Sequence, residues 1–287
     1  MYEKPEDTIL AGYSVLDLTD AKGSLCVRLL ACMGAEVVRI NPENEPGYFR
    51  NLIKNADILI ETFRPGYLVS LGLGYAALSK LNPRLIMASI THFGQSGPYK
   101  DFKSSELIDQ ALGGWLSVTG GAEAPLKLFG NQSYNTASLF AVNGILLALR
   151  QRHATGKGQY LDISIMECVV ATLDYVLPRY FYEGIVSRRR GSLHWNNAFR
   201  VFPCKDGYIL LSIHHQWETL VELMASEGMA GDLINEKWRD REERDRNIEH
   251  VITIIKKWTL SHQAGELEEK GQLMHFPWAA VKAAKNG

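Results

Sequence analysis

The sequence predicts an α/β protein with a parallel β-sheet, followed by a smaller α+β domain. Residues 13–40 read as strand, glycine loop, helix and strand, an order that favours parallel strands joined by a right-handed crossover. Residues 129–173 read as helix, tight turn, buried strand and helix, with enough apolar surface for a sizeable core. After residue 184 a hairpin and charged helices replace this pattern. We therefore expect a large domain at 1–184 and a small domain at 185–287.

The first half of the chain alternates strands with helices. We expect strands at 13–18, 35–40, 56–63 and 84–90, and helices at 24–33, 49–55, 75–81 and 104–112. Arg64, Pro65 and Gly66 end the third strand in a firm turn. Because ligands bind at the carboxyl ends of the strands in open α/β sheets, the loops after Phe63 and Ile90 are the expected walls of a site.

The central stretch supplies much of the core. Apolar residues recur at helical spacing at Leu139, Val142, Ile145, Leu146 and Leu149. This helix is expected to end at Gly156, since glycine tolerates the left-handed conformation of a helix exit. A strand at 160–165 follows, and then an apolar helix that we expect to continue through Tyr182. Two glycine pairs, at 113–114 and 120–121, bracket a short apolar segment, and the rest of 113–131 is expected to be loop.

The small domain is expected to contain one hairpin and several helices. Asp206 and Gly207 support a type I′ turn between strands at 199–203 and 208–212. Helices are expected at 216–225, 237–246, 251–260 and 264–270. The arginine-rich loop at 187–191 can hold a phosphate or can be a solvated loop, and the residues leave both readings open.

Composition excludes several classes of protein. A net charge of −1 over 287 residues argues against general binding to nucleic acid or to anionic membranes. The longest apolar run is too short to span a bilayer, which needs ~20 residues. The four cysteines form no C-x-x-C pair and are expected to be reduced, as in a cytoplasmic protein. Histidine and cysteine show no metal-ligand spacing, so no metal is expected.

Glu106 and Asp109 form the paired carboxylates of the predicted helix at 104–112, where their spacing puts them on one face. They can perform acid–base chemistry, or they can cap and solvate the first helical turn, where carboxylates suit the helix dipole. Asp162 and Glu167 lie near the core strand, and a structural role is the simpler interpretation for both.

Seven segments together resemble the class III CoA-transferase family, which includes formyl-CoA transferases, carnitine CoA-transferases and α-methylacyl-CoA racemases. The segments are VLDLT (15–19), GAEVVRI (34–40), ADILIETFRPG (56–66), LGLGYAALSKLNPRLIMASITHFGQSGPY (71–99), TGKGQYLDISIMEC (155–168), RRRGSLH (188–194) and FPCKDGYILLS (202–212). They follow the family's order through most of the chain. The resemblance implies a Rossmann-like large domain, a smaller second domain and two subunits interlocked like links of a chain.

The resemblance also implies a site for CoA along the carboxyl ends of the large-domain strands. Carried over by position, Arg39, Thr62 and Phe63 lie beside the adenosine end, and Lys103 matches a lysine of the CoA site. The implied partners are an acyl-CoA, a small carboxylic acid, and a second subunit in a homodimer or a heteromer. CoA is then a substrate, and no covalently bound cofactor is implied.

The chain departs from the family pattern at the nucleophile. The family's aspartate lies ten residues before the glycine that is Gly144 here, and this position holds Tyr134. The aspartate attacks an acyl-CoA to form a mixed anhydride, which CoA converts to an enzyme thioester, and a phenol with a reference pKa of about 10 cannot replace it. Ser105 likewise stands at the racemases' histidine. The stretch between Asn41 and Phe49 is shorter than in the family, and the closing segment is missing beyond Lys285.

Three hypotheses follow for the function. In the first, the chain transfers CoA between an acyl-CoA and a carboxylic acid as one subunit of a heteromer whose partner brings the aspartate. In the second, it is a catalytically silent subunit that binds CoA or supports assembly. In the third, it is an enzyme of altered chemistry that uses Glu106, Asp109 or Glu167.

Overall fold

The computed structural model describes residues 8–42 and 46–282 of the chain. The stretch between Asn41 and Phe49 is therefore described only in part, because 43–45 lie outside the described residues. Contacts between residues divide the chain into two compact units. One consists of 1–119 and 125–187, and the other of 120–124 and 188–287. The second unit thus takes in a short excursion at 120–124 that the sequence did not predict.

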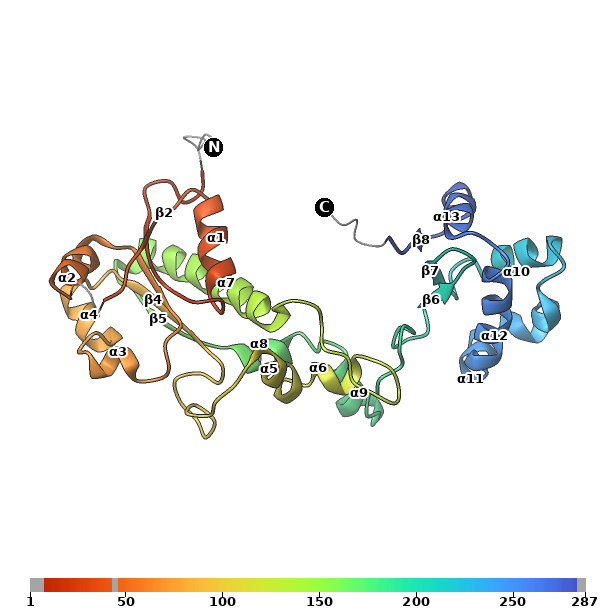
Figure 1. Cartoon of the computed structure of the whole chain (residues 1–287), viewed down its shortest axis with the longest axis horizontal. Coiled ribbons are helices and arrows are strands. Elements are labelled where there is room, and N and C mark those ends of the chain that lie inside the picture. Colours follow the sequence, from red (N-terminus) through yellow and green to blue (C-terminus); the bar gives the residue numbers. More distant parts are fainter. Residues whose placement is uncertain (1–7, 43–45, 283–287) are drawn as a thin grey trace. The chain divides into compact units, whose positions relative to one another are not determined.

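The first unit is built on a five-stranded sheet in which all strands are parallel, in the order β2-β1-β3-β4-β5 (Figure 1). The strands are β1 (Ser14–Leu18), β2 (Glu36–Arg39), β3 (Ile58–Glu61), β4 (Ile86–Thr91) and β5 (Tyr160–Ser164). The predicted α/β fold with a parallel sheet is confirmed. All residues of β3 and β4 are buried, as expected for parallel strands with helices on both faces.

Successive strand residues enter two different cores. Val15, Ile58 and Ile60 join one buried cluster, whereas Leu16 and Leu59 join another. This alternation follows from the two-residue period of a strand, which sends neighbouring side chains to opposite faces of the sheet. The sheet therefore separates two apolar layers, each closed by its own helices.

The helices of the first core are α1 (Ser24–Cys32), α7 (Gln132–Thr155) and α8 (Ile165–Ala171), and those of the second are α2 (Pro46–Asn55), α3 (Tyr67–Ser70) and α4 (Tyr75–Leu81). The long helix α7 packs against α1, α8, β4 and β5. It ends at Gly156, which adopts a left-handed conformation at φ 71°, as the sequence predicts.

One expectation for the first unit is wrong. The helix after β5 does not continue through Tyr182, because α8 stops at Ala171 and α9 (Val176–Glu183) begins separately. Thr172 turns its hydroxyl back onto the Val169 carbonyl and accepts a hydrogen bond from the Trp115 indole at 2.9 Å, which stabilises the break. That indole belongs to α6 (Trp115–Val118), a short helix formed by the apolar segment between the two glycine pairs; it follows α5 (Glu106–Leu112).

The second unit contains the predicted hairpin. Its sheet consists of β6 (Phe199–Pro203), β7 (Tyr208–Ser212) and the short β8 (Ala279–Ala280), all antiparallel. The expected type I′ turn is wrong, because it requires positive φ at two residues and neither Asp206 nor Gly207 has it. The loop is instead held from outside, since the Asp206 carboxylate accepts the backbone N–H of Ala264 at 2.8 Å.

Helices pack around this hairpin. They are α10 (Trp217–Ser226), α11 (Arg241–Arg246), α12 (Ile248–Thr259) and α13 (Ala264–Leu273), with 3₁₀ turns at Gly231–Ile234 and Glu236–Arg239. The helix expected at 237–246 is interrupted at Asp240, which is extended and caps α11 by accepting the N–H of Glu242. The core of the unit contains the fully buried Trp258, Trp278 and Phe202.

The arginine-rich loop is tied to backbone carbonyls. Arg189 donates to the carbonyls of Gly121 at 3.0 Å and Ala122 at 3.2 Å, and Arg190 donates to that of Trp195 at 3.0 Å. These bonds attach the excursion at 120–124 to the second unit. They favour a structural role for the loop over the phosphate-binding alternative.

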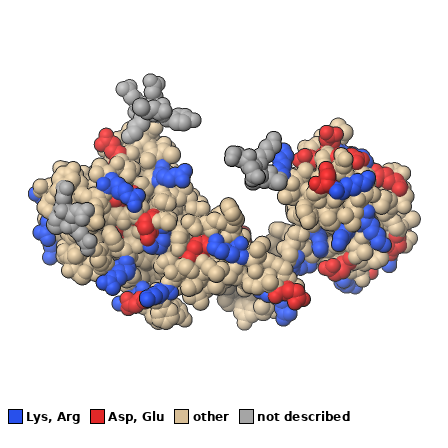
Figure 2. Space-filling model, viewed as in Figure 1, with Lys and Arg blue, Asp and Glu red and all other residues tan. Residues whose placement is uncertain are grey.

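The face of the molecule seen in Figure 2 carries no large patch of one charge sign. On the face seen in Figure 2, lysine and arginine are interspersed with aspartate and glutamate over each unit. Among the helices of the described residues, none combines the length and apolarity needed to cross a bilayer.

Candidate active site

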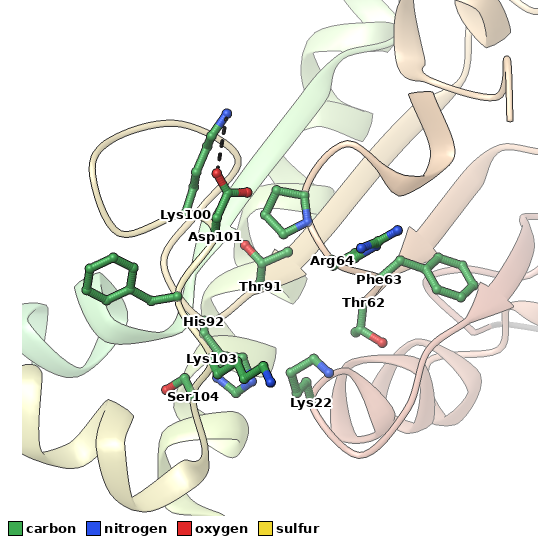
Figure 3. Close-up of a pocket in the computed structure, with 12 residues that line it drawn as sticks. Lys22, Thr62, Phe63, Arg64, Thr91, His92, Lys100, Asp101, Lys103 and Ser104 are labelled. Atoms are coloured by element: carbon green, nitrogen blue, oxygen red, sulfur yellow. Dashed lines mark ion pairs between the residues drawn. The ribbon is translucent and has the colours of Figure 1, made fainter. Parts of the chain in front are cut away.

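A cavity of about 580 Å³ opens at the carboxyl edge of the parallel sheet (Figure 3). Its walls come from the loops after β1, β3 and β4. The lining residues are Lys22, Thr62, Phe63, Arg64, Pro65, Thr91, His92, Lys100, Asp101, Phe102, Lys103 and Ser104. This is the place where open α/β sheets bind ligands, and it matches the loops expected from the sequence.

A second cavity of about 440 Å³ adjoins the first. Both are lined by Thr62 and Phe63, and the second is also lined by Arg39 and the β1 loop. The two hollows share walls made by Thr62 and Phe63, and we call them together the groove, with Arg39 in one hollow and Lys103 in the other. Four of the residues singled out from the sequence lie along this groove.

The β1 and β3 loops are fastened to one another. The Thr62 hydroxyl accepts the backbone N–H of Asp20 at 2.9 Å, and Arg39 donates to the Thr19 carbonyl at 2.9 Å. Gly23 is needed for this packing, because a Cβ there would lie 2.7 Å from the Thr19 Cγ2. The β1 loop is thus a tightly packed structural turn.

Positive charge dominates the cavity. Lys22, Arg64, Lys100 and Lys103 line it against the single carboxylate of Asp101, and in Figure 3 Lys22 and Lys103 lie near one another on different loops. Burial opposes ionisation of Asp20, but its hydrogen bonds with Lys22 and the charge of that ammonium lower the pKa of the Asp20 carboxyl below its ordinary value. The cavity suits an anionic ligand.

A buried hydroxyl in the cavity wall is left unsatisfied. The Thr91 Oγ1 at the end of β4 is inaccessible to solvent and has no hydrogen-bond partner among the described residues. Buried polar atoms are normally paired, so this hydroxyl is an exception in the wall of the cavity.

The paired carboxylates of α5 are buried, so the expectation of a solvated first turn is wrong. Glu106 accepts hydrogen bonds from the Gln110 amide at 2.5 Å and the Ser133 N–H at 3.2 Å, and it pairs with Lys127 at 2.7 Å. Burial acts to raise the pKa of Glu106, but these partners hold it below its ordinary value. Glu106 therefore stabilises the start of α7, and it does not line the cavity.

Tyr134 lies in the first turn of α7 and is partly buried. Burial, followed by the charges of Asp109, Glu106 and Asp20, raises the pKa of Tyr134 to about 12, although a hydrogen bond from the Glu106 backbone acts in the opposite direction. The phenol is thus un-ionised at neutral pH. The described residues that line the cavity do not include Tyr134, although its ring centre lies 6.0 Å from that of His92.

Comparison with known proteins decides the family. A family model described as CoA-transferase family III matches residues 43–286. The chain belongs to CoA-transferase family III. The resemblance inferred from the sequence is therefore confirmed.

Named members of CoA-transferase family III are similar over most of the chain. The Succinyl-CoA:(R)-benzylsuccinate CoA-transferase subunit BbsE of Thauera aromatica is 30% identical, covering 91% of this chain and 75% of that protein. The Succinyl-CoA–L-malate CoA-transferase beta subunit of Chloroflexus aurantiacus is 33% identical, covering 87% of this chain and 63% of that protein. A crystal structure of a CAIB/BAIF family protein from Brucella suis matches with a TM-score of 0.86 at 23% identity, over 96% of this chain and 84% of that one, which supports the fold.

Two other carboxylates singled out from the sequence of this family III chain are Asp162 and Glu167. Asp162 accepts the backbone N–H of Gln95 through both oxygens, at 2.9 and 3.1 Å, and so holds the loop after β4. Glu167 is exposed in the first turn of α8. Among the described residues, no three His, Cys, Asp or Glu side chains come close enough to hold a metal ion.

His92 is the cavity residue that sequence reasoning missed. It directly follows β4, in a loop that was expected to form the site, and its Nδ1 lies 2.8 Å from the Asp109 carboxylate. The position of a histidine immediately after a buried strand was the available signal. Its partner, 17 residues later, could not be identified without the fold.

Proposed function

We propose that the chain binds acyl-CoA in the groove between Arg39 and Lys103 and takes part in moving CoA between an acyl-CoA and a small carboxylic acid. Membership of CoA-transferase family III and the names of the relatives support the reaction class. The observation that carries the location is the positively charged cavity at the carboxyl edge of the sheet, with its unsatisfied Thr91 hydroxyl.

The chemistry of CoA fits this groove. Its phosphates need cationic partners, and the groove offers Arg39 at the end of β2, Lys103 in the loop after β4, and Lys22 in the loop after β1, which also pairs with Asp20. Lys103 has no hydrogen-bond or ion-pair partner among the described residues, so its ammonium is available to a phosphate. Phe63 supplies an aromatic surface beside Arg39 for the adenine.

We further infer that the chain works as one subunit of a heteromer with a related CoA-transferase chain. A neutral phenol at position 134 cannot form the mixed anhydride, so the nucleophilic carboxylate would come from the partner subunit. The names of two relatives describe subunits, which supports this assembly. A catalytically silent CoA-binding or assembly subunit is the second candidate, and it rests on the same replacement at Tyr134.

An exposed apolar surface supports association with a second subunit. On and beside α9, Tyr180 is 55% exposed, Phe181 75%, Tyr182 90% and Val186 66%. Large exposed apolar side chains concentrated on one short segment are a feature of protein interfaces. We expect sedimentation at micromolar concentration to show a dimer or heteromer, and a stable monomer would contradict the interlocked arrangement. Since the thiols of Cys26, Cys168 and Cys204 are free and buried, we place the protein in a reducing compartment such as the cytoplasm.

Calorimetry with CoA tests the proposed site. We expect binding to the unmodified chain and an affinity at least about tenfold weaker for Lys103→Ala, because one charge-assisted phosphate contact is lost. Lys257→Ala, which removes an exposed lysine of α12 in the second unit, is the matched control and should bind like the unmodified chain. Equal affinity for all three would remove Lys103 from the site. An absence of binding would favour a purely structural subunit.

A further inference from the structure

His92 and Asp109 form a hydrogen-bonded pair in the wall of the cavity. The His92 Nδ1 lies 2.8 Å from one oxygen of Asp109, whose side chain is completely buried, and the Ser104 hydroxyl donates to the other oxygen at 2.8 Å. A carboxylate only accepts hydrogen bonds, so in the neutral imidazole Nδ1 carries the proton and Nε2 keeps its lone pair.

The Nε2 atom is available to a molecule bound in the cavity. His92 lines the cavity and its side chain is 22% exposed. Nε2 has no hydrogen-bond partner within residues 8–42 and 46–282, and it is not among their solvent-inaccessible unpaired atoms. A base that is oriented on one nitrogen and open on the other has the geometry required for proton transfer to or from a bound molecule.

Three elements fix the position of the imidazole. The His92 carbonyl accepts the N–H of Met166 at 3.0 Å, which attaches the backbone to α8. Asp109 holds the ring from α5, and the Tyr134 ring of α7 lies against it, at 6.0 Å between centres. The orientation is therefore built into the fold.

We propose that His92, oriented by Asp109, makes this cavity a site of acyl-CoA hydrolysis. The inference rests on the proposed CoA site, because the thioester must lie beside His92. Nε2 takes a proton from water while the water oxygen bonds to the thioester carbonyl carbon. The tetrahedral intermediate then breaks its carbon–sulfur bond, and Nε2 returns the proton to the departing sulfur. The products are a carboxylic acid and CoA with a free thiol.

Other residues of the cavity suit this step. Lys22 and Lys103 line the same cavity as His92, so their positive charge is available to a carbonyl oxygen that becomes negative there, and such stabilisation is usually a large part of catalysis by acyl-transfer enzymes. Among the described residues that line the cavity the one carboxylate is Asp101, which lies 4.0 Å from the Lys100 ammonium. Glu106 is bound to Lys127 and to the start of α7, and position 134 is a neutral phenol. Water is therefore the nucleophile that the cavity can use without a partner subunit.

The experiment follows the loss of thioester ultraviolet absorbance of acetyl-CoA and succinyl-CoA, without any acceptor acid, above the uncatalysed rate. We expect hydrolysis by the unmodified chain and a fall of about a hundredfold in kcat for His92→Ala, the range typical of a lost general base. Added imidazole should partly restore the rate of His92→Ala. His250→Ala is the matched control, because that histidine pairs with Asp232 at 2.7 Å in the second unit, and its rate should be unchanged.

Asp109 acts through His92 and is a positioning residue. Asp109→Asn should lower kcat at least about tenfold and leave the affinity for CoA unchanged, because the wrong tautomer of the imidazole is then favoured. If the His92–Asp109 pair were purely structural, Asp109→Asn would weaken CoA binding and turnover together, and imidazole would not restore the activity of His92→Ala.

The outcomes separate this inference from the proposed function. Binding of CoA without hydrolysis of either thioester overturns the hydrolysis proposal and leaves the CoA site intact. Hydrolysis that is unchanged in His92→Ala also overturns it. If CoA does not bind to the unmodified chain, the proposed function fails, and this inference fails with it.

Discussion

Replacing Glu61 by glutamine tests how burial controls the stability of the first unit. Glu61 ends β3 and is 4% exposed, and one of its oxygens accepts the Phe63 N–H at 2.7 Å. Burial raises the pKa of Glu61 from 4.5 to about 7, although hydrogen bonds from Ser89 and Phe63 act in the opposite direction. The folded state thus binds this proton more tightly than the unfolded chain does.

The sign and size of the effect follow from proton linkage. Below about pH 4.5 both states carry the proton and the full stability is present; between about pH 4.5 and pH 7 the free energy of unfolding falls as the pH rises. The span of about 2.5 pH units corresponds to about 3 kcal/mol at ~1.36 kcal/mol per unit. Glutamine resembles the protonated carboxyl and accepts the same N–H. Glu61→Gln should therefore be more stable than the unmodified chain by up to about 3 kcal/mol at about pH 8.

Hydrogen exchange of the β3 and β4 amides in urea measures the stability of this unit separately from the second one. The measurement at about pH 5 and about pH 8 compares the unmodified chain, Glu61→Gln and the control Glu36→Gln, which changes an exposed carboxylate on β2. The control should follow the unmodified chain. A Glu61→Gln variant with no gain at the higher pH would refute the reasoning, because the buried carboxylate would then carry no ionisation penalty.

Two further changes test the packing of the sheet and the missing nucleophile. A Cβ at Gly158 would lie 1.9 Å from the Leu85 carbonyl oxygen, so Gly158→Ala should destabilise the first unit by at least about 1–3 kcal/mol in urea unfolding, whereas Gly207→Ala, with nothing within 4 Å, should have a much smaller effect. Tyr134→Asp should gain a hydroxylamine-sensitive enzyme–CoA adduct in intact-mass analysis after incubation with an acyl-CoA, and the unmodified chain should show none. An adduct on the unmodified chain would direct the search for a nucleophile to other carboxylates.

The apolar pattern of the sequence was sufficient to predict most strands of the parallel sheet. Strand residues such as Val15 and Leu16, or Ile58 and Leu59, are apolar on both faces because helices cover both, and this produces continuous apolar runs that are visible in sequence. The end of α7 at Gly156 was equally visible, since a left-handed helix exit favours glycine. The groove loops followed from the same reasoning, because ligand sites lie at the carboxyl ends of parallel strands.

Only the tertiary structure decided how the polar side chains are used. Glu106 and Asp109 share a helix face, yet one stabilises α7 and the other orients His92, because their partners arrive from different parts of the chain. The hairpin turn was mispredicted for a similar reason: Asp206 is bound to the N–H of Ala264, 58 residues away. Hydrogen bonds over such separations carry no periodic signal in a sequence. They form only after the apolar core has brought the elements together.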